Sequence, residues 1–346
     1  MTLQAGTAVF ENTLCDGTAP CVGRAAEDEC RIVLTPRHGG GEHRARVRYV
    51  LSDTRNAPLV VVQGGISATR HAFAHDGQAG WWDAIVGPGL AIDTQRFRVL
   101  SIEWLDHADF GAAAGATLRA IGSEDQADAI AALLGRLGVR RLHAFVGASY
   151  GAMVGLAFAA RHRGLVRRIV AVAGAHRAHP LAIAVRSLQR EIVRFGARHG
   201  AAAAALALAR RLAMTTYRGE REFAERCAAP PIFRDGRYRF AEEDWLEAAG
   251  ASFVRRFAVE RFLALSESID LHAVAPEDIR VPATLIGIAS DRIVPLADLC
   301  DLQRRAGAAA ELHVIDSRYG HDAFLKEPDK IGPLIAAALD AQGGTR

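Results

Sequence analysis

A serine between two glycines is the residue in this sequence best suited to chemistry. Gly147, Ser149 and Gly151 match the G-x-S-x-G pattern of a nucleophile elbow, in which a serine stands at a sharp strand-to-helix turn. An apolar segment at 142–148 precedes the turn, and a helical segment rich in alanine and glycine follows it at 150–161. We therefore interpret Ser149 as a nucleophile whose hydroxyl oxygen is exposed at the turn.

Two backbone amides are placed to stabilise the negative charge that forms when a serine attacks a carbonyl carbon. The amide of Tyr150 falls at the start of the helix that follows Ser149, where the helix dipole favours negative charge. The loop QGGIS at 63–67 ends another apolar segment and supplies the amide of Ile66. We predict that Ile66 and Tyr150 form an oxyanion hole.

A serine nucleophile needs a base that takes its proton and an acid that orients the base. Asp291 and His321 each follow a predicted strand, so both reach the edge of the sheet that carries Ser149. The chain order of nucleophile, acid and histidine is one of the known orders of such triads. Asp291 also suits a helix-capping role, and Asp316 lies too early in its strand to orient His321. We predict a triad of Ser149, Asp291 and His321.

Strands and helices alternate around these residues, which is typical of a doubly wound, mostly parallel sheet. The predicted strands lie at 29–37, 43–53, 59–65, 97–102, 141–147, 167–176, 281–291 and 311–317, and the first two form an antiparallel pair. Predicted helices lie at 123–138, after the elbow, at 295–305 and from 330 onward.

Between 176 and 280 this alternation stops, and nearly the whole segment has helical periodicity. A long helical segment between two strands of one sheet is typical of a lid inserted into a core domain. We therefore divide the chain into the first part of the core at 1–175, a helical lid at 176–280 and the second part of the core at 281–346. Residues 1–28 are expected to be irregular.

Composition and charge argue against several classes of protein. The chain has 346 residues, 50% of them hydrophobic and 23% charged, which suits a globular protein with a large core. The net charge of +3 lacks the asymmetry of a nucleic-acid binder, and we expect neither a nucleic-acid nor a membrane partner. We find no signal peptide at the N-terminus. The five cysteines are odd in number and form no recognisable framework, which favours the reducing cytoplasm.

Two histidines have the spacing of a zinc pair on a helix. His71 and His75 are four residues apart, but no glutamate stands beside them in an H-E-x-x-H pattern and no third ligand is evident. We therefore predict no metal site.

Five further motifs stand out along the chain: GWWDAIVGPGLAIDT at 80–94, ARRLAMTTYR at 209–218, SIDLH at 268–272, DRIVP at 291–295 and GHDAFL at 320–325. These motifs resemble those of the homoserine O-acyltransferases, a family with the α/β-hydrolase fold, and the resemblance extends over most of the chain from about Val60. The last two together are specific, because ordinary esterases rarely place an aspartate directly after the catalytic histidine. The elbow GASYGAM and the loop QGGISA depart from the family's GGSMGGM-like and HALTG-like forms.

The resemblance implies an α/β-hydrolase fold with a helical lid and adds residues that bind the substrate. Asp322 would bind the ammonium group of homoserine, Arg210 its carboxylate, and Tyr217 would also contact it. A buried zwitterion needs one fixed cation and one fixed anion. From the residues alone, a structural ion pair or a solvated face is the preferred interpretation of Asp322 and Arg210.

The expected activity is ping-pong transfer of an acyl group from acyl-CoA through Ser149 to the hydroxyl of L-homoserine, a step in methionine synthesis. The segment at 184–191 resembles the branch that uses succinyl-CoA, and Arg186 or Arg190 would meet the succinyl carboxylate. Acetyl-CoA is the other donor considered, and no cofactor beyond the acyl-CoA is expected. Alternatives are a serine esterase with water as acceptor, an acyltransferase acting on L-serine, and a non-catalytic binding module. The helical lid also suggests a homodimer.

Overall fold

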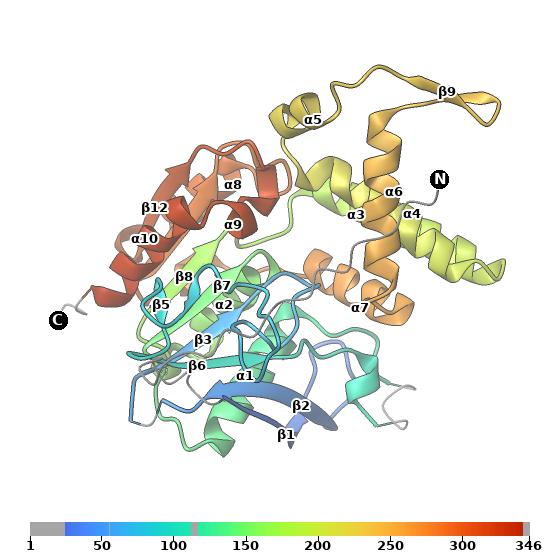
Figure 1. The fold of residues 1–346 in the computed structure, drawn as a ribbon. Coiled ribbons are helices and arrows are strands. Elements are labelled where there is room, and N and C mark those ends of the chain that lie inside the picture. Colours follow the sequence, from blue (N-terminus) through green and yellow to red (C-terminus); the bar gives the residue numbers. More distant parts are fainter. Residues whose placement is uncertain (1–24, 55, 112–116, 342–346) are drawn as a thin grey trace, which may run out of the picture.

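A computed structural model of the chain describes residues 25–54, 56–111 and 117–341 (Figure 1). Its centre is an eight-stranded sheet in the order β1-β2-β6-β3-β7-β8-β11-β12. The strands are β1 (Ala25–Leu34), β2 (His43–Ser52), β3 (Leu59–Gln63), β6 (Arg98–Ile102), β7 (Ala144–Ala148), β8 (Ile169–Val172), β11 (Ala283–Ile288) and β12 (Ala310–Ile315). β2 pairs antiparallel with β1 and β6, and all other neighbours pair in parallel. The sheet is therefore mostly parallel, as predicted.

Each central strand is buried on both faces because helices cover the two sides of the sheet. Successive valines of β3 alternate between the two hydrophobic cores, Val61 in one and Val60 and Val62 in the other. The first core includes apolar side chains of α1 (Ser123–Arg136), α2 (Tyr150–Arg161) and α8 (Leu296–Ala306), and the second includes those of α9 (Ala323–Lys326) and α10 (Pro328–Asp340). The short strands β4 (Val86–Gly87) and β5 (Ile92–Asp93) also lie on the second side.

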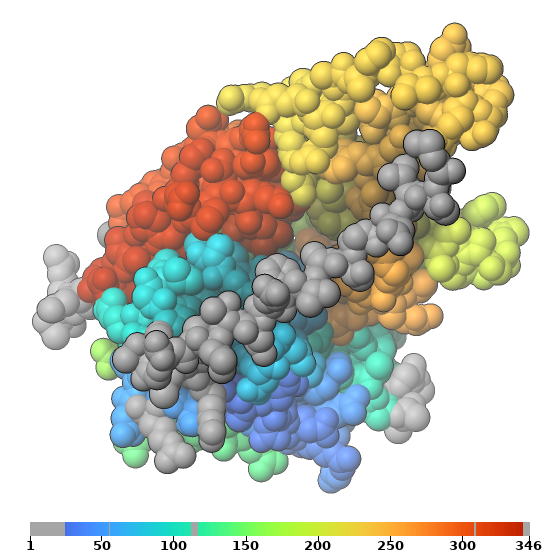
Figure 2. All heavy atoms as spheres, in the orientation of Figure 1, coloured from blue at the N-terminus to red at the C-terminus, as the bar shows by residue number. Residues whose placement is uncertain are grey.

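Between β8 and β11 the chain forms an insertion of helices, a lobe next to the C-terminal part of the sheet (Figures 1 and 2). Its elements are α3 (Pro180–Arg198), α4 (Ala202–Tyr217), α5 (Glu220–Arg226), β9 (Ile232–Arg234), β10 (Arg237–Arg239), α6 (Ala241–Val254) and α7 (Val259–Asp270). We call the segment from α3 to α7 the insertion. The boundaries 1–175, 176–280 and 281–346 of the predicted domains stay a prediction.

A hairpin inside the insertion corrects the expectation of nearly continuous helix. β9 and β10 pair antiparallel around Asp235 and Gly236, whose φ angles are 52° and 78°. Two positive φ angles in an Asp-Gly pair are the signature of a two-residue hairpin turn, and the sequence IFRDGRYR contained that signal.

The N-terminal expectation is also partly wrong. β1 begins at Ala25, within the segment 1–28 that we expected to be irregular, because Ala25–Leu34 pairs along its whole length with β2. Residues 1–24 lie outside the described residues. Along 25–54, 56–111 and 117–341, no helix is long and apolar enough to cross a membrane.

Candidate active site

The turn at Ser149 has the geometry of a nucleophile elbow. Ser149 has φ 55° and ψ −118°, a conformation that glycine adopts readily and serine rarely. A Cβ atom at Gly147 would lie 2.1 Å from the carbonyl oxygen of Gly151, and one at Gly151 would lie 2.2 Å from that of Gln63. Both glycines are therefore required by close backbone packing, which holds the strained serine at the end of β7.

Ser149, His321 and Asp291 form one chain of hydrogen bonds. The Oγ atom of Ser149 lies 2.7 Å from Nε2 of His321, and Nδ1 of His321 lies 2.7 Å from Oδ2 of Asp291. The other carboxylate oxygen of Asp291 accepts the amides of Ile293 and Val294 at 2.8 and 3.0 Å. The carboxylate is thus held in place, and it orients a histidine that can take the serine proton.

The environment of His321 favours its protonated form. Burial by itself would lower the pKa of this imidazole, but the charge of Asp291, its hydrogen bond and the charge of Asp322 outweigh burial, so the pKa is raised above 6.5. The imidazolium formed during proton transfer is therefore stabilised, and the neutral base predominates only above this raised pKa.

The amides predicted for the oxyanion hole lie beside Ser149. Tyr150 is the first residue of α2, and the structure pairs neither its amide nor that of Ile66 with a backbone acceptor along the described chain. A Cβ atom on Gly65 would lie 3.8 Å from the Oγ atom of Ser149, so this loop faces the serine. The arrangement suits stabilisation of an oxyanion.

Trp104 contacts the Gly65–Ile66 peptide and the ring of Tyr150, and sequence reasoning missed this role. Its Nε1 atom donates to the carbonyl oxygen of Gly65 at 3.0 Å, and its ring packs edge-on against Tyr150 at 4.8 Å. The Gly65 carbonyl and the Ile66 amide belong to one planar trans peptide, so the C=O and N–H groups point in opposite directions. Trp104 therefore sets the direction of the Ile66 N–H group. In the sequence, the one signal for this role is the position of Trp104 just after the strand β6.

Replacing Trp104 with phenylalanine should lower kcat by about 100-fold with little change in KM, because the Ile66 amide loses its orientation while the ring contact remains. Steady-state kinetics tests this. Trp82→Phe is the matched control, since it removes an equally buried indole donor, which bonds the Phe324 carbonyl at 2.8 Å. Equal loss of kcat in both variants would contradict the positioning role of Trp104.

A cavity of about 410 Å³ lies beside Ser149, between the core and the insertion. It brings together side chains from both parts of the chain, and its lining includes Ser149, Ile66, His321, Arg210, Tyr217 and Asp322. The predicted substrate contacts thus share one space with the predicted nucleophile. Their roles in binding stay a prediction.

Arg210 is a cation without a carboxylate partner among the described residues. Its guanidinium lies 5.2 Å from the ring centre of Tyr217 and 4.9 Å from that of Phe253. These aromatic faces hold the charge in the cavity wall without neutralising it. Arg210 can therefore receive an anionic group of a ligand.

Asp322 is paired with an arginine that sequence reasoning did not assign. Its Oδ2 atom lies 2.8 Å from Nε of Arg218, in an ionic contact without hydrogen-bond alignment. Arg218 also donates to the buried Glu222 at 2.9 and 3.0 Å. The Oδ1 atom of Asp322 has no cationic partner among the described residues, so it can bind a second cation.

Glycines bring the end of α4 against the histidine turn. Gly320 has φ 60°, and a Cβ atom there would lie 2.7 Å from the carbonyl oxygen of Tyr217. A Cβ atom at Gly219 would likewise lie 2.3 Å from the carbonyl oxygen of Arg318. Side chains at either glycine would push the insertion away from His321.

Within the insertion, two arginines of α3 share one aspartate of α7. Arg186 and Arg190 contact separate oxygens of Asp270 at 2.6 Å each, and all three side chains are buried. Arg190 also donates to Ser266, whereas Nη2 of Arg186 is buried without a partner. Arg186 and Tyr217 line a smaller cavity of about 150 Å³. The cluster carries an excess positive charge that an anion can balance.

The sheet, the elbow and the hydrogen-bonded triad define an α/β hydrolase. The family model described as alpha/beta hydrolase fold matches residues 58–328. Among solved structures, a homoserine O-acetyltransferase from Bacillus anthracis superposes with a TM-score of 0.83 at 19% identity, over 93% of this chain and all of that one. Esterase E22 superposes with a TM-score of 0.81 at 18% identity, over 91% of this chain and all of that one. These likenesses establish the fold.

Proteins similar in sequence show which α/β hydrolases this chain belongs with. A homoserine O-succinyltransferase from Xanthomonas campestris pv. campestris is 48% identical, over 93% of this chain and 86% of the relative. A serine O-succinyltransferase from Stenotrophomonas maltophilia is 33% identical, over 88% of this chain and 94% of the relative. The chain belongs to the homoserine and serine O-acyltransferases of the α/β-hydrolase fold, and it is an acyltransferase. The predicted fold and family are confirmed.

Proposed function

We propose that this enzyme transfers a succinyl group from succinyl-CoA to the hydroxyl of L-homoserine through a succinyl-Ser149 intermediate. One observation carries the proposal: Ser149, the guanidinium of Arg210 and the carboxylate of Asp322 line a single cavity. A plain esterase needs only the first of these. The 48% identical homoserine O-succinyltransferase supports the same donor and acceptor.

In the first half-reaction, Nε2 of His321 takes the Ser149 proton as Oγ attacks the thioester carbonyl. The amides of Ile66 and Tyr150 stabilise the oxyanion, and CoA leaves as the thiol with the proton from His321. In the second half-reaction, His321 takes the proton of the homoserine hydroxyl, which attacks the acyl carbon. The proton then returns to Ser149 as the ester product leaves.

Binding of the amino acid directs the acyl group to homoserine instead of water. We assign its carboxylate to Arg210, against the ring of Tyr217, and its ammonium to the Oδ1 side of Asp322. Opposite charges at two points fix the molecule so that its hydroxyl reaches the acyl-serine, and positioning of this kind accelerates the second step. Without that positioning, the same triad would serve hydrolysis.

The donor assignment rests on the buried arginine pair. Two guanidinium groups face one carboxylate, Asp270. Arg186 lines the smaller cavity beside Tyr217, and its buried Nη2 atom has no hydrogen-bond partner among the described residues. We assign the distal succinyl carboxylate to this atom, because an uncompensated buried cation is costly and an anion offsets the cost. The acetyl group of acetyl-CoA has no carboxylate that could do so.

Thiol release from succinyl-CoA or acetyl-CoA, with and without L-homoserine or L-serine, tests the proposal. We expect one turnover per enzyme without acceptor and sustained release with succinyl-CoA and L-homoserine. Sustained release without an amino acid would identify an esterase. Faster turnover with L-serine would reassign the acceptor, as the names of several relatives allow.

Replacing Arg186 with methionine should lower kcat/KM for succinyl-CoA by about 100-fold, because the distal carboxylate loses its charge partner. The value for acetyl-CoA should change by less than about fivefold, since acetyl lacks that carboxylate. The ratio of the two values in each variant is the measurement. Arg194→Met, a substitution two turns further along the same helix, is the control. Parallel losses for both donors would contradict the assignment.

We also propose a cytoplasmic homodimer. Leu181, Leu188 and Phe195 are spaced by seven along α3 and are 62%, 54% and 59% exposed, a stripe that suits packing against a second copy. Sedimentation should give twice the monomer mass, and Phe195→Glu should shift the protein toward monomer. A monomeric wild-type protein would contradict the dimer.

A further inference from the structure

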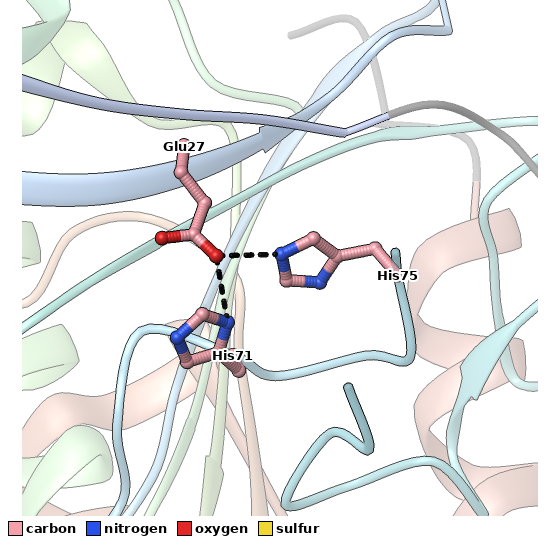
Figure 3. Close-up of side chains that lie close together, drawn as sticks. All are labelled: Glu27, His71 and His75. Atoms are coloured by element: carbon pink, nitrogen blue, oxygen red, sulfur yellow. Dashed lines mark hydrogen bonds and ion pairs between the residues drawn. The ribbon is translucent and has the colours of Figure 1, made fainter. Parts of the chain in front are cut away.

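Three side chains with metal-binding atoms gather on the β1 side of the molecule, apart from the triad. Glu27 comes from β1, and His71 and His75 come from the loop after β3 (Figure 3). One possible ligand atom from each residue lies within 4.8 Å of the other two. Among the described residues, this is the one group of three or more such side chains that could hold a metal ion. The two histidines lie in a loop and not on a helix. The packing of β1 against this loop brings Glu27 to them as a possible third ligand.

Both imidazoles face the same carboxylate oxygen. Oε1 of Glu27 lies 3.3 Å from Nε2 of His75 and 3.6 Å from Nδ1 of His71, and Figure 3 shows both nitrogens pointing toward it. Tetrahedral zinc with bonds of about 2.1 Å separates its ligand atoms by about 3.4 Å. The two distances match the edges of such a site.

The hydrogen bonds around the cluster leave lone pairs facing inward. The Nδ1 atom of His75 lies 3.2 Å from the carbonyl oxygen of Phe73, so in the neutral ring Nδ1 donates there and Nε2 is an acceptor. That acceptor faces the Glu27 carboxylate oxygen, which is also an acceptor. The Nδ1 atom of His71 is buried without a hydrogen-bond partner. A cation between these atoms would satisfy all three.

A proton on His75, shared with Oε1 of Glu27 at 3.3 Å, is the competing explanation, and the stacking of the two rings weighs only against a second proton on His71. The rings of His71 and His75 stack 5.0 Å apart, so two imidazolium charges would repel each other.

The surroundings also resemble those of a built site. Arg70 contacts Oε2 of Glu27 at 2.7 Å and so orients the carboxylate with Oε1 toward the histidines. The Phe73 carbonyl fixes the ring of His75 in the same way. The side chain of His75 is 1% exposed and that of Glu27 is 35% exposed, so the cluster has a buried base and an open side for entry.

We propose that Glu27, His71 and His75 form a binding site for one divalent transition-metal ion of the zinc type, with water completing its coordination. Imidazole and carboxylate ligands suit such an ion. The ion would tie β1 to the loop that begins just after the Gly65–Ile66 peptide. Its role is structural, because the triad needs no metal for the proposed reaction.

Calorimetric titration of the metal-stripped full chain with Zn²⁺ tests the proposal. We expect the wild type to bind one more Zn²⁺ per chain than Glu27→Gln or His71→Asn, each of which removes one ligand at a partly exposed position. Saturating Zn²⁺ should also raise the melting temperature of the wild type but not that of Glu27→Gln or His71→Asn. At a free concentration 100 times Kd, the unfolding equilibrium constant should fall about 100-fold.

The pair His313 and Glu311, 3.3 Å apart, supplies the control, because it offers two ligands without a third among the described residues. His313→Asn should keep the wild-type stoichiometry. The same Zn²⁺ stoichiometry in wild type, Glu27→Gln and His71→Asn would place the ion at the triad or at thiols and overturn the proposal. The absence of Zn²⁺ binding to the wild type would overturn it in favour of a shared proton.

Discussion

Replacing Ser149 with glycine should abolish acyl transfer and at the same time make the folded protein more stable. The activity is lost because no nucleophile remains, and kcat should fall by about 10⁶. The stability rises because Ser149 has φ 55° and ψ −118°, a conformation that costs a non-glycine residue about 1–3 kcal/mol. The greater flexibility of unfolded glycine offsets about 0.5–1 kcal/mol of this gain. Denaturant unfolding should show a net gain of about 1 kcal/mol.

Ser149→Ala is the matched control, because it removes the hydroxyl but keeps the Cβ atom and therefore the strain. It should be as inactive as the glycine variant, with a free energy of unfolding close to that of the wild type. Mass spectrometry after mixing with succinyl-CoA should detect an acyl adduct on the wild type and on neither variant. An adduct on either variant, or a glycine variant less stable than the alanine variant, would contradict this account.

Replacing Asp291 with asparagine should lower kcat by about 10⁴ while leaving the fold intact. Asparagine keeps an oxygen that can accept the amides of Ile293 and Val294, but its amide group cannot accept the Nδ1 proton of His321 as the carboxylate does. The imidazole then adopts the wrong tautomer and loses the charge that stabilises its protonated form. Steady-state kinetics and circular dichroism together test this prediction.

The pH dependence of the same variant has a defined sign. In the wild type the pKa of His321 is raised above 6.5, so activity should be lost as the pH falls through that raised value. Because Asp291 raises this pKa, the residual activity of Asp291→Asn should fall off at a lower pH. Asp298→Asn, which removes another buried carboxylate of this region, should change neither the rate nor the profile. An unshifted acid limb in Asp291→Asn would contradict the role of Asp291.

Local pattern by itself determined the elbow and the strands around it. Glycine spacing, an apolar strand and a following helix predict where Ser149 stands, since these features act over a few neighbouring residues. The order of strands then places Asp291 and His321 at the same edge of a parallel sheet. The structure brings both within hydrogen-bond distance in one chain with Ser149.

Only the tertiary structure decided which distant side chains meet. The contact of Trp104 with the Gly65 carbonyl depends on how β6 lies beside β3, and the pairing of Arg218 with Asp322 depends on how the insertion docks. The third member of the histidine cluster, Glu27, comes from the edge strand β1. Sequence spacing carries no information on such contacts, because they arise when elements far apart in the chain pack together.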